Sequence, residues 1–73
     1  GIYKLYMGKN VLNKFRQDNG YKQKTYQKIW NGQEDNIYLM NFLDKVEEIG
    51  DDFEQVIYDR LQEKYKKILL SKE

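Results

Sequence analysis

The sequence has 73 residues, no cysteine and no histidine, and a formal net charge of +1. A chain of this length forms one domain with a thin core. The missing residue types exclude a disulfide framework, the usual zinc sites, and catalysis by serine–histidine or cysteine–histidine pairs. No stretch has the pattern of a membrane span or a signal peptide, and the absence of cysteine fits a cytoplasmic location.

The charges are strongly segregated along the chain. Residues 1–30 carry seven cations and one acid, residues 31–63 carry two cations and ten acids, and residues 64–73 carry four cations and one acid. A basic first third beside an acidic middle indicates a site that faces one way. It does not have the uniform basicity of a typical nucleic-acid binder.

The first predicted helix covers residues 2–18. It carries an apolar stripe at helical spacing, in which a glycine allows close approach of a neighbour: Ile2, Leu5, Gly8, Leu12 and Phe15. Lys9, Asn13 and Arg16 follow a spacing of four and three residues, which places them on one helix face beside that stripe. This row is either a binding surface or a plain solvated face.

A break at Asn19-Gly20 ends this helix, since both residues tolerate the left-handed conformation. Residues 20–30 then show neither helical nor strand periodicity, which predicts a long basic loop. A short extended piece is conceivable here, but a single strand would have no partner in the chain. Tyr26 and Trp30 are expected to anchor the loop to the core.

The second predicted helix covers residues 32–49, with Asn31 and Glu34 as a capping box at its start. Its apolar stripe consists of Leu39, Phe42, Leu43, Val46 and Ile49. A third helix over residues 52–70 is expected to be capped in the same way by Asp51 and Glu54. It should bury Phe53, Val56, Ile57, Leu61, Tyr65, Ile68 and Leu69. The predicted fold class is therefore all-α: three helices with a long basic loop between the first two.

Four acids lie between the last two helices: Glu47, Glu48, Asp51 and Asp52. Hard cations bind clustered carboxylates. These four straddle a helix end, however, where acids already serve as caps and dipole partners. We therefore predict no metal site in this chain.

Two motifs stand close together in the first half of the sequence. GKNVLNKFRQDNGY runs from Gly8 to Tyr21, and YQKIWNGQEDN runs from Tyr26 to Asn36. Together they closely resemble the C-terminal motifs of the dimeric, all-α dUTP diphosphatases of kinetoplastids, some phages and the Campylobacter group. The resemblance is densest over residues 9–36 and continues more weakly to about residue 70.

The resemblance assigns roles to six residues. Lys9 and Arg16 look like clamps for the phosphates, and Lys28 reaches the same phosphates from the loop. Asn13 and Asn36 look like amide contacts to the substrate, and Tyr21 like a hydroxyl donor or a wall beside it. The substrate-binding set is thus Lys9, Asn13, Arg16, Tyr21, Lys28 and Asn36.

In that family an N-terminal half supplies paired acidic motifs that hold Mg²⁺. No such pair occurs in residues 1–73, and the chain opens without methionine on an apolar run. We therefore expect a single C-terminal fragment of a larger all-α enzyme that lacks its metal-binding portion and is inactive alone. Its expected partners are dUTP or dUDP, the missing N-terminal half and a second copy in a homodimer that buries part of residues 2–7, with no membrane and no nucleic acid.

One alternative remains from the residues themselves. Basic residues interleaved with aromatic rings are also typical of a small helical module that binds nucleic acid or an acidic partner. In that case Tyr21, Tyr26 and Trp30 would serve as stacking platforms. A purely structural helical domain is the third possibility.

Overall fold

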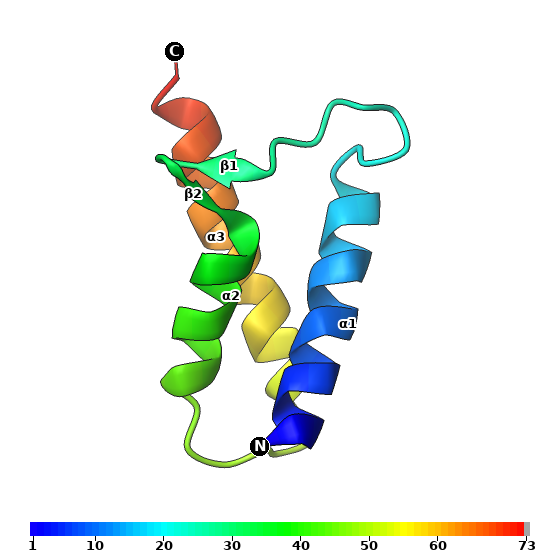
Figure 1. The fold of residues 1–73 in the computed structure, drawn as a ribbon, viewed down its shortest axis with the longest axis vertical. Helices are drawn as coiled ribbons and strands as arrows, with labels where there is room; N and C mark the ends of the chain where they lie inside the picture. The colour runs from blue at the N-terminus through cyan, green and yellow to red at the C-terminus, as the bar shows by residue number, and fades with distance from the viewer. Residues whose placement is uncertain (73) are drawn as a thin grey trace.

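Three helices make up most of the chain in the computed structural model, which describes residues 1–72 (Figure 1). Helix α1 spans Ile2–Asp18, α2 spans Asp35–Asp44 and α3 spans Phe53–Leu70. Helices α1 and α3 rise in the same general direction and α2 descends between them in sequence, so that the N-terminus and the C-terminus lie at opposite ends (Figure 1). Each helix packs against the other two. The predicted arrangement of three helices is confirmed.

Helix α1 begins and ends as the sequence predicts. Gly20 has a φ of +97°, and the backbone N–H of Tyr21 donates to the carbonyl of Arg16 at 3.1 Å, the bond that closes a Schellman-type helix end. Gly8 is buried against α2, and a Cβ there would lie 2.8 Å from a methyl carbon of Leu43. A side chain at position 8 would therefore require the Leu43 side chain to move.

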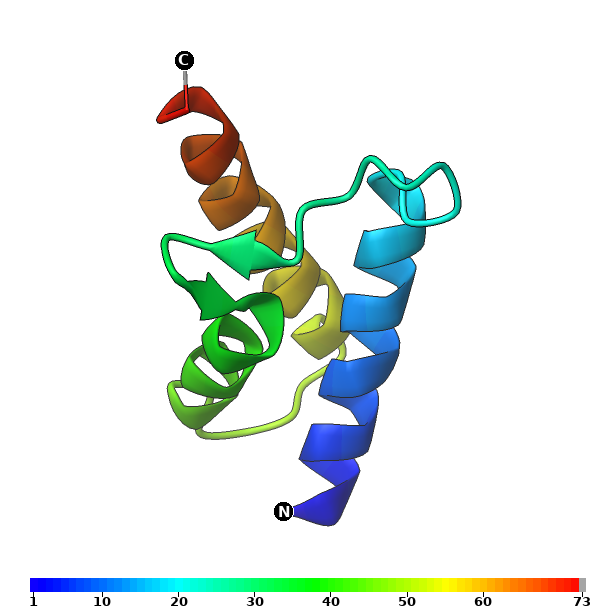
Figure 2. The same ribbon diagram turned by 45° about the horizontal axis from the view of Figure 1, so that its top comes forward.

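The loop after α1 leads into a short antiparallel hairpin that we did not predict. Strand β1, Ile29–Trp30, pairs with β2, Gln33–Glu34, and Figure 2 shows the hairpin crossing above the start of α2. Asn31 and Gly32 form its turn with φ values of +51° and +86°. Positive φ at both positions is typical of the type I′ turn that Asn-Gly favours. The fold is thus mostly helical but not purely all-α, and the expectation that a strand here has no partner was wrong.

The predicted caps of α2 and α3 were both wrong. Asn31 lies in the turn and does not cap α2, whose N-cap is Glu34 without a side-chain cap bond. Helix α3 has Asp52 as its N-cap, again without a side-chain cap bond, so the predicted Asp51 and Glu54 capping box was also wrong.

Helix α2 ends at Asp44, five residues before the predicted end. Glu47 and Glu48 would have occupied its last turn, where the negative end of the helix dipole disfavours acids. Val46 still packs against the core from the connecting segment, and its carbonyl accepts a hydrogen bond from the Lys4 amine.

The core is built from all three helices and from Trp30 of the hairpin. Its buried apolar side chains are Val11, Leu12, Phe15, Trp30, Leu39, Leu43, Phe53, Ile57, Leu61, Tyr65 and Ile68. The Phe15 ring lies at its centre, with the rings of Tyr26, Trp30, Tyr58 and Tyr65 around it at centroid distances of 5.5 to 6.2 Å. Edge-on contacts of this kind favour one arrangement of the rings.

Four apolar residues of the predicted stripes are exposed instead. Ile2, Leu5, Ile49 and Leu69 expose 89 %, 38 %, 41 % and 39 % of their surface. Tyr3 and Tyr6, near Ile2 on α1, are exposed as well. Within the described residues no helix is both long and apolar enough to cross a membrane.

Candidate functional site

The predicted row on α1 faces the start of α2. The amine of Lys9 donates a hydrogen bond to the side-chain oxygen of Asn36. At the other end of the row, the guanidinium of Arg16 donates to Asp35, the residue before Asn36. Asn13 lies between the two cations in the row and is exposed. Two consecutive residues at the start of α2 therefore hold the two cations of α1.

Arg16, Tyr26 and Asp35 form a buried hydrogen-bonded group that we call the inner trio. Arg16 donates from Nε to one carboxylate oxygen and from Nη2 to the other, both at 2.8 Å. The Tyr26 hydroxyl donates to the first of these oxygens at 2.6 Å. Asp35 is fully buried, whereas the Arg16 side chain keeps 20 % of its surface exposed. A buried carboxylate is stable only with partners of this kind.

The inner trio shifts the acidity of each member. Burial alone would raise the pKa of Asp35, but the hydrogen bonds from Arg16 and Tyr26 outweigh it, and the net pKa lies below its usual range. The hydrogen bond to Asp35 raises the pKa of Arg16 against the opposing effect of burial. Burial and the bond to Asp35 raise the pKa of Tyr26 far above 10. Near neutral pH the trio therefore holds one anion, one cation and one neutral phenol.

Lys28 reaches the same region from the hairpin. Its amine lies 3.3 Å from the Glu34 carboxylate, and both side chains are more than half exposed. Its carbonyl accepts the backbone N–H of Asp35 at 2.8 Å. This ion pair joins the residue before β1 to Glu34 of β2, which directly precedes Asp35.

Tyr21 lies apart from this group. It is 54 % exposed in the turn that follows α1. Its backbone N–H donates a hydrogen bond to the carbonyl of Arg16. The structure thus brings Lys9, Arg16, Lys28 and Asn36 together at the start of α2. Asn13 lies between Lys9 and Arg16 on α1 and Tyr21 lies in the turn after α1, and within residues 1–72 neither side chain has a hydrogen bond with these four residues.

Sequence reasoning missed Asp35 and the polar role of Tyr26. Asp35 shares its helix face with Leu39 and Leu43, at steps of four residues, and both leucines are buried. An acid on a buried stripe requires a cation nearby. That spacing was the available signal. Trp30 and Tyr26 anchor the loop as predicted, since Trp30 is fully buried and Tyr26 stacks on Tyr65.

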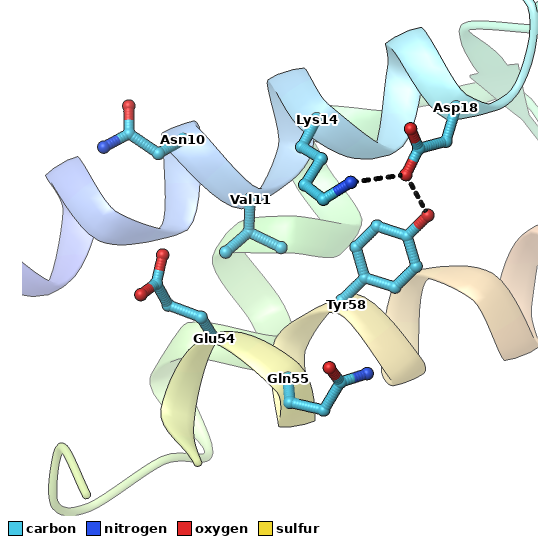
Figure 3. A pocket seen from close by; sticks show the side chains of 7 residues that line it. All are labelled: Asn10, Val11, Lys14, Asp18, Glu54, Gln55 and Tyr58. Atoms are coloured by element: carbon cyan, nitrogen blue, oxygen red, sulfur yellow. Dashed lines mark hydrogen bonds and ion pairs between the residues drawn. The ribbon is translucent and has the colours of Figure 1, made fainter. Parts of the chain in front are cut away.

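A second polar group lies on the opposite side of α1. Lys14, Asp18 and Tyr58, which we call the outer trio, line an open hollow of about 500 Å³ between α1 and α3 (Figure 3). The Lys14 amine and the Tyr58 hydroxyl both donate to one oxygen of Asp18, at 3.0 and 2.5 Å. The hollow contains none of the six predicted substrate residues.

The described residues do not assemble a metal site. Within residues 1–72 no group of three or more acidic, histidine or cysteine side chains is close enough to hold an ion. Glu47, Glu48, Asp51 and Asp52 are all exposed around the connection from α2 to α3. No magnesium site is therefore assigned to residues 1–72.

Comparison of the chain with protein-family models and with curated proteins gives no match. The assignment of function below thus depends on the motifs in the sequence and on the geometry of the site.

Proposed function

We propose that this chain is the substrate-clamping part of a Mg²⁺-dependent dUTP diphosphatase, which hydrolyses dUTP to dUMP and pyrophosphate. One observation carries the proposal: Lys9 and Arg16 converge on adjacent residues of α2. Their positions lie seven residues apart, a rise of about 10 Å along a helix. Their partners are neighbours in the chain, about 3.8 Å apart between Cα atoms. Both cationic side chains therefore reach the first turn of α2.

A pair of converging cations suits a chain of phosphates. Hydrolysis between the α- and β-phosphates spreads negative charge over several oxygens, and fixed cations stabilise that charge without rearranging. In this proposal Lys9, Arg16 and Lys28 bind the phosphates. Asn13 and Asn36 contact the substrate through their amide groups, and Tyr21 supplies a hydroxyl donor or a wall beside it.

The proposal places the magnesium ligands outside this chain, as the resemblance implies. The chemistry that magnesium would supply there is the activation of the attacking water. The residues described here contribute only binding and orientation, so the chain alone is expected to bind dUTP or dUDP and not to hydrolyse either. Cytoplasmic location stays a prediction.

The burial and the contacts of two aromatic rings weaken the alternative of a nucleic-acid-binding module. Trp30 is fully buried, and Tyr26 is occupied by Asp35 and Tyr65. Of the three candidate stacking rings only Tyr21 is largely exposed. One ring is too few for the successive stacking that single-stranded nucleic acid requires.

Homodimer formation is part of the proposal. The support for it is the cluster of exposed apolar side chains at the start of α1, where Ile2, Tyr3 and Tyr6 expose 89 %, 65 % and 63 % of their surface. Exposed apolar patches drive association. Sedimentation should show a dimer that Ile2→Lys weakens, and a monomer at high concentration would contradict it.

Calorimetric titration tests the binding role. We expect dUTP to bind more tightly than dUMP, because the β- and γ-phosphates add contacts to the cations. Lys9→Met should weaken dUTP binding roughly tenfold, the typical effect of one charge-assisted hydrogen bond. Lys66→Met, an exposed lysine on α3, is the matched control. Equal affinities for dUTP and dUMP, or equal effects of the two substitutions, would refute the proposal.

A further inference from the structure

Asp35 is the one charged side chain that is fully buried in the described part of the chain, and it lies beside the proposed phosphate site. Its two oxygens receive two N–H groups from one edge of the Arg16 guanidinium. A guanidinium carries five N–H groups in a fixed plane. The bond pattern therefore uses two of them and leaves both N–H groups of Nη1 and the second one of Nη2.

The orientation of the guanidinium follows from this pattern. Because Asp35 is fully buried, the edge that contacts it is turned toward the interior. The unused N–H groups lie on the edges turned away from Asp35. The bound hydroxyl of Tyr26 restrains the carboxylate itself, at 2.6 Å.

We infer that Asp35 is a positioning residue, which holds Arg16 so that its free Nη1 edge receives a phosphate oxygen beside the amine of Lys9. This inference rests on the proposed function and adds a role that the six predicted residues do not include. Asp35 itself does not contact the substrate. It acts through Arg16, and Tyr26 acts through Asp35.

The alternative role for Asp35 is competition with phosphate for Arg16. A carboxylate paired with Arg16 lowers the local positive charge, so an acid that only competes with phosphate would weaken binding. Removing such an acid would tighten phosphate binding. Removing a positioning acid weakens binding even though the net charge becomes more positive. The sign of the change therefore separates the two roles.

The first readout is the motion of the guanidinium by NMR without any ligand. The chain has two arginines, Arg16 and Arg60, and Arg60 is exposed on α3. We expect slow rotation about the Nε–Cζ bond of Arg16 in the wild-type chain and fast rotation in Asp35→Asn, with Arg60 unchanged in both. Fast rotation of Arg16 in the wild-type chain would overturn the inference.

The second readout is the affinity for pyrophosphate in the same samples. Asp35→Asn should bind pyrophosphate roughly tenfold more weakly than wild type, from loss of one oriented charge-assisted contact. Asp44→Asn is the matched control, because it makes the same substitution at an exposed residue at the other end of α2. It should bind equally well or more tightly. Unchanged or tighter binding by Asp35→Asn would overturn the inference.

Two further results also bear on the inference: an Asp35→Asn variant that does not fold, and a wild-type chain that does not bind pyrophosphate. If Asp35→Asn does not fold, judged by loss of the Trp30 indole N–H signal, Asp35→Glu takes its place. It keeps the charge and moves the carboxylate by one methylene, so weaker pyrophosphate binding supports positioning and unchanged binding overturns it. If the wild-type chain binds no pyrophosphate, the proposed function itself fails and the inference fails with it.

Discussion

The inner and outer trios contain the same chemical parts in different surroundings. Each has an aspartate that accepts hydrogen bonds from a cation and from a tyrosine hydroxyl, at 2.6 Å for Tyr26 and 2.5 Å for Tyr58. The carboxylate of the inner trio is fully buried, whereas the Asp18 side chain is 39 % exposed. Their cations differ in the same sense, with 20 % of the Arg16 side chain and 70 % of the Lys14 side chain exposed.

The comparison shows that burial, and not the list of bonds, decides what such a group contributes. A solvent-exposed pair gains little because water and salt screen it. A buried carboxylate depends on its partners, so the removal of one partner leaves a charge without compensation. The inner trio therefore fixes the shape of the site, and the outer trio is a surface feature.

The largest expected effect is the loss of the Arg16 partner. Arg16→Met should lower the free energy of unfolding by about 3–5 kcal/mol, because Asp35 stays buried without its cation. The double change Arg16→Met with Asp35→Leu should recover most of that loss, since two apolar residues replace the pair. Urea denaturation followed by Trp30 fluorescence measures both. A cost for Arg16→Met no greater than for Lys14→Met would remove the distinction between the trios.

The tyrosines give the next largest contrast. Tyr26→Phe removes a hydrogen bond to a buried carboxylate and should cost about 1.5–3 kcal/mol. Tyr58→Phe removes the corresponding bond to an exposed carboxylate and should cost only a small fraction of that. Denaturation of the two variants side by side is the check, and equal losses would contradict the account.

The stability that the inner trio contributes should also depend on acid. The folded pKa of Asp35 lies below its ordinary value of 3.8, so its contribution to stability is complete above that value and is lost as pH falls through the folded pKa. The stability of wild type relative to the double variant should thus stay constant from neutral pH down to about 4 and fall below it. A relative stability of wild type that already falls between pH 7 and 5 would contradict this.

The smallest effect concerns Tyr58. Its hydrogen bond to Asp18, together with partial burial, raises the pKa of Tyr58 to about 12. Any stability that this bond contributes is present below the ordinary tyrosine value of 10 and is lost as pH rises through 12. Asp18→Asn should move the pKa of Tyr58 back toward 10, as measured from its ring-carbon chemical shifts. A pKa that Asp18→Asn leaves unchanged would show that the bond is absent in solution.

The fold was predictable where one local signal dominated. Helix α1 has an apolar stripe and a clear Asn-Gly stop, and both of its ends are as predicted. Asn31-Gly32 fits two patterns, a helix cap and a hairpin turn, and only the backbone geometry separates them. The predicted α2 extended five residues too far at its end because the apolar spacing continues to Ile49. Glu47 and Glu48 oppose a helix end there.

The site was predictable only in part, for a related reason. Helical spacing alone places Lys9 and Arg16 on one face of α1. The pairing of Arg16 with Asp35 joins residues 19 positions apart and depends on how α2 packs, which periodicity does not show. Most acids are exposed, so Asp35 was counted with its neighbours as part of an acidic surface.

An NMR map of dUTP binding on the isotope-labelled chain tests the central claim most directly. The account predicts that dUTP shifts the signals of Lys9 and Arg16, on the side of α1 that faces α2. It predicts the same for Lys28, just before β1, and for Asn36, on α2. The outer trio, on the side that faces α3, should keep its signals unchanged. Shifts concentrated on Lys14, Asp18 and Tyr58, or no shifts at the start of α2, would contradict it.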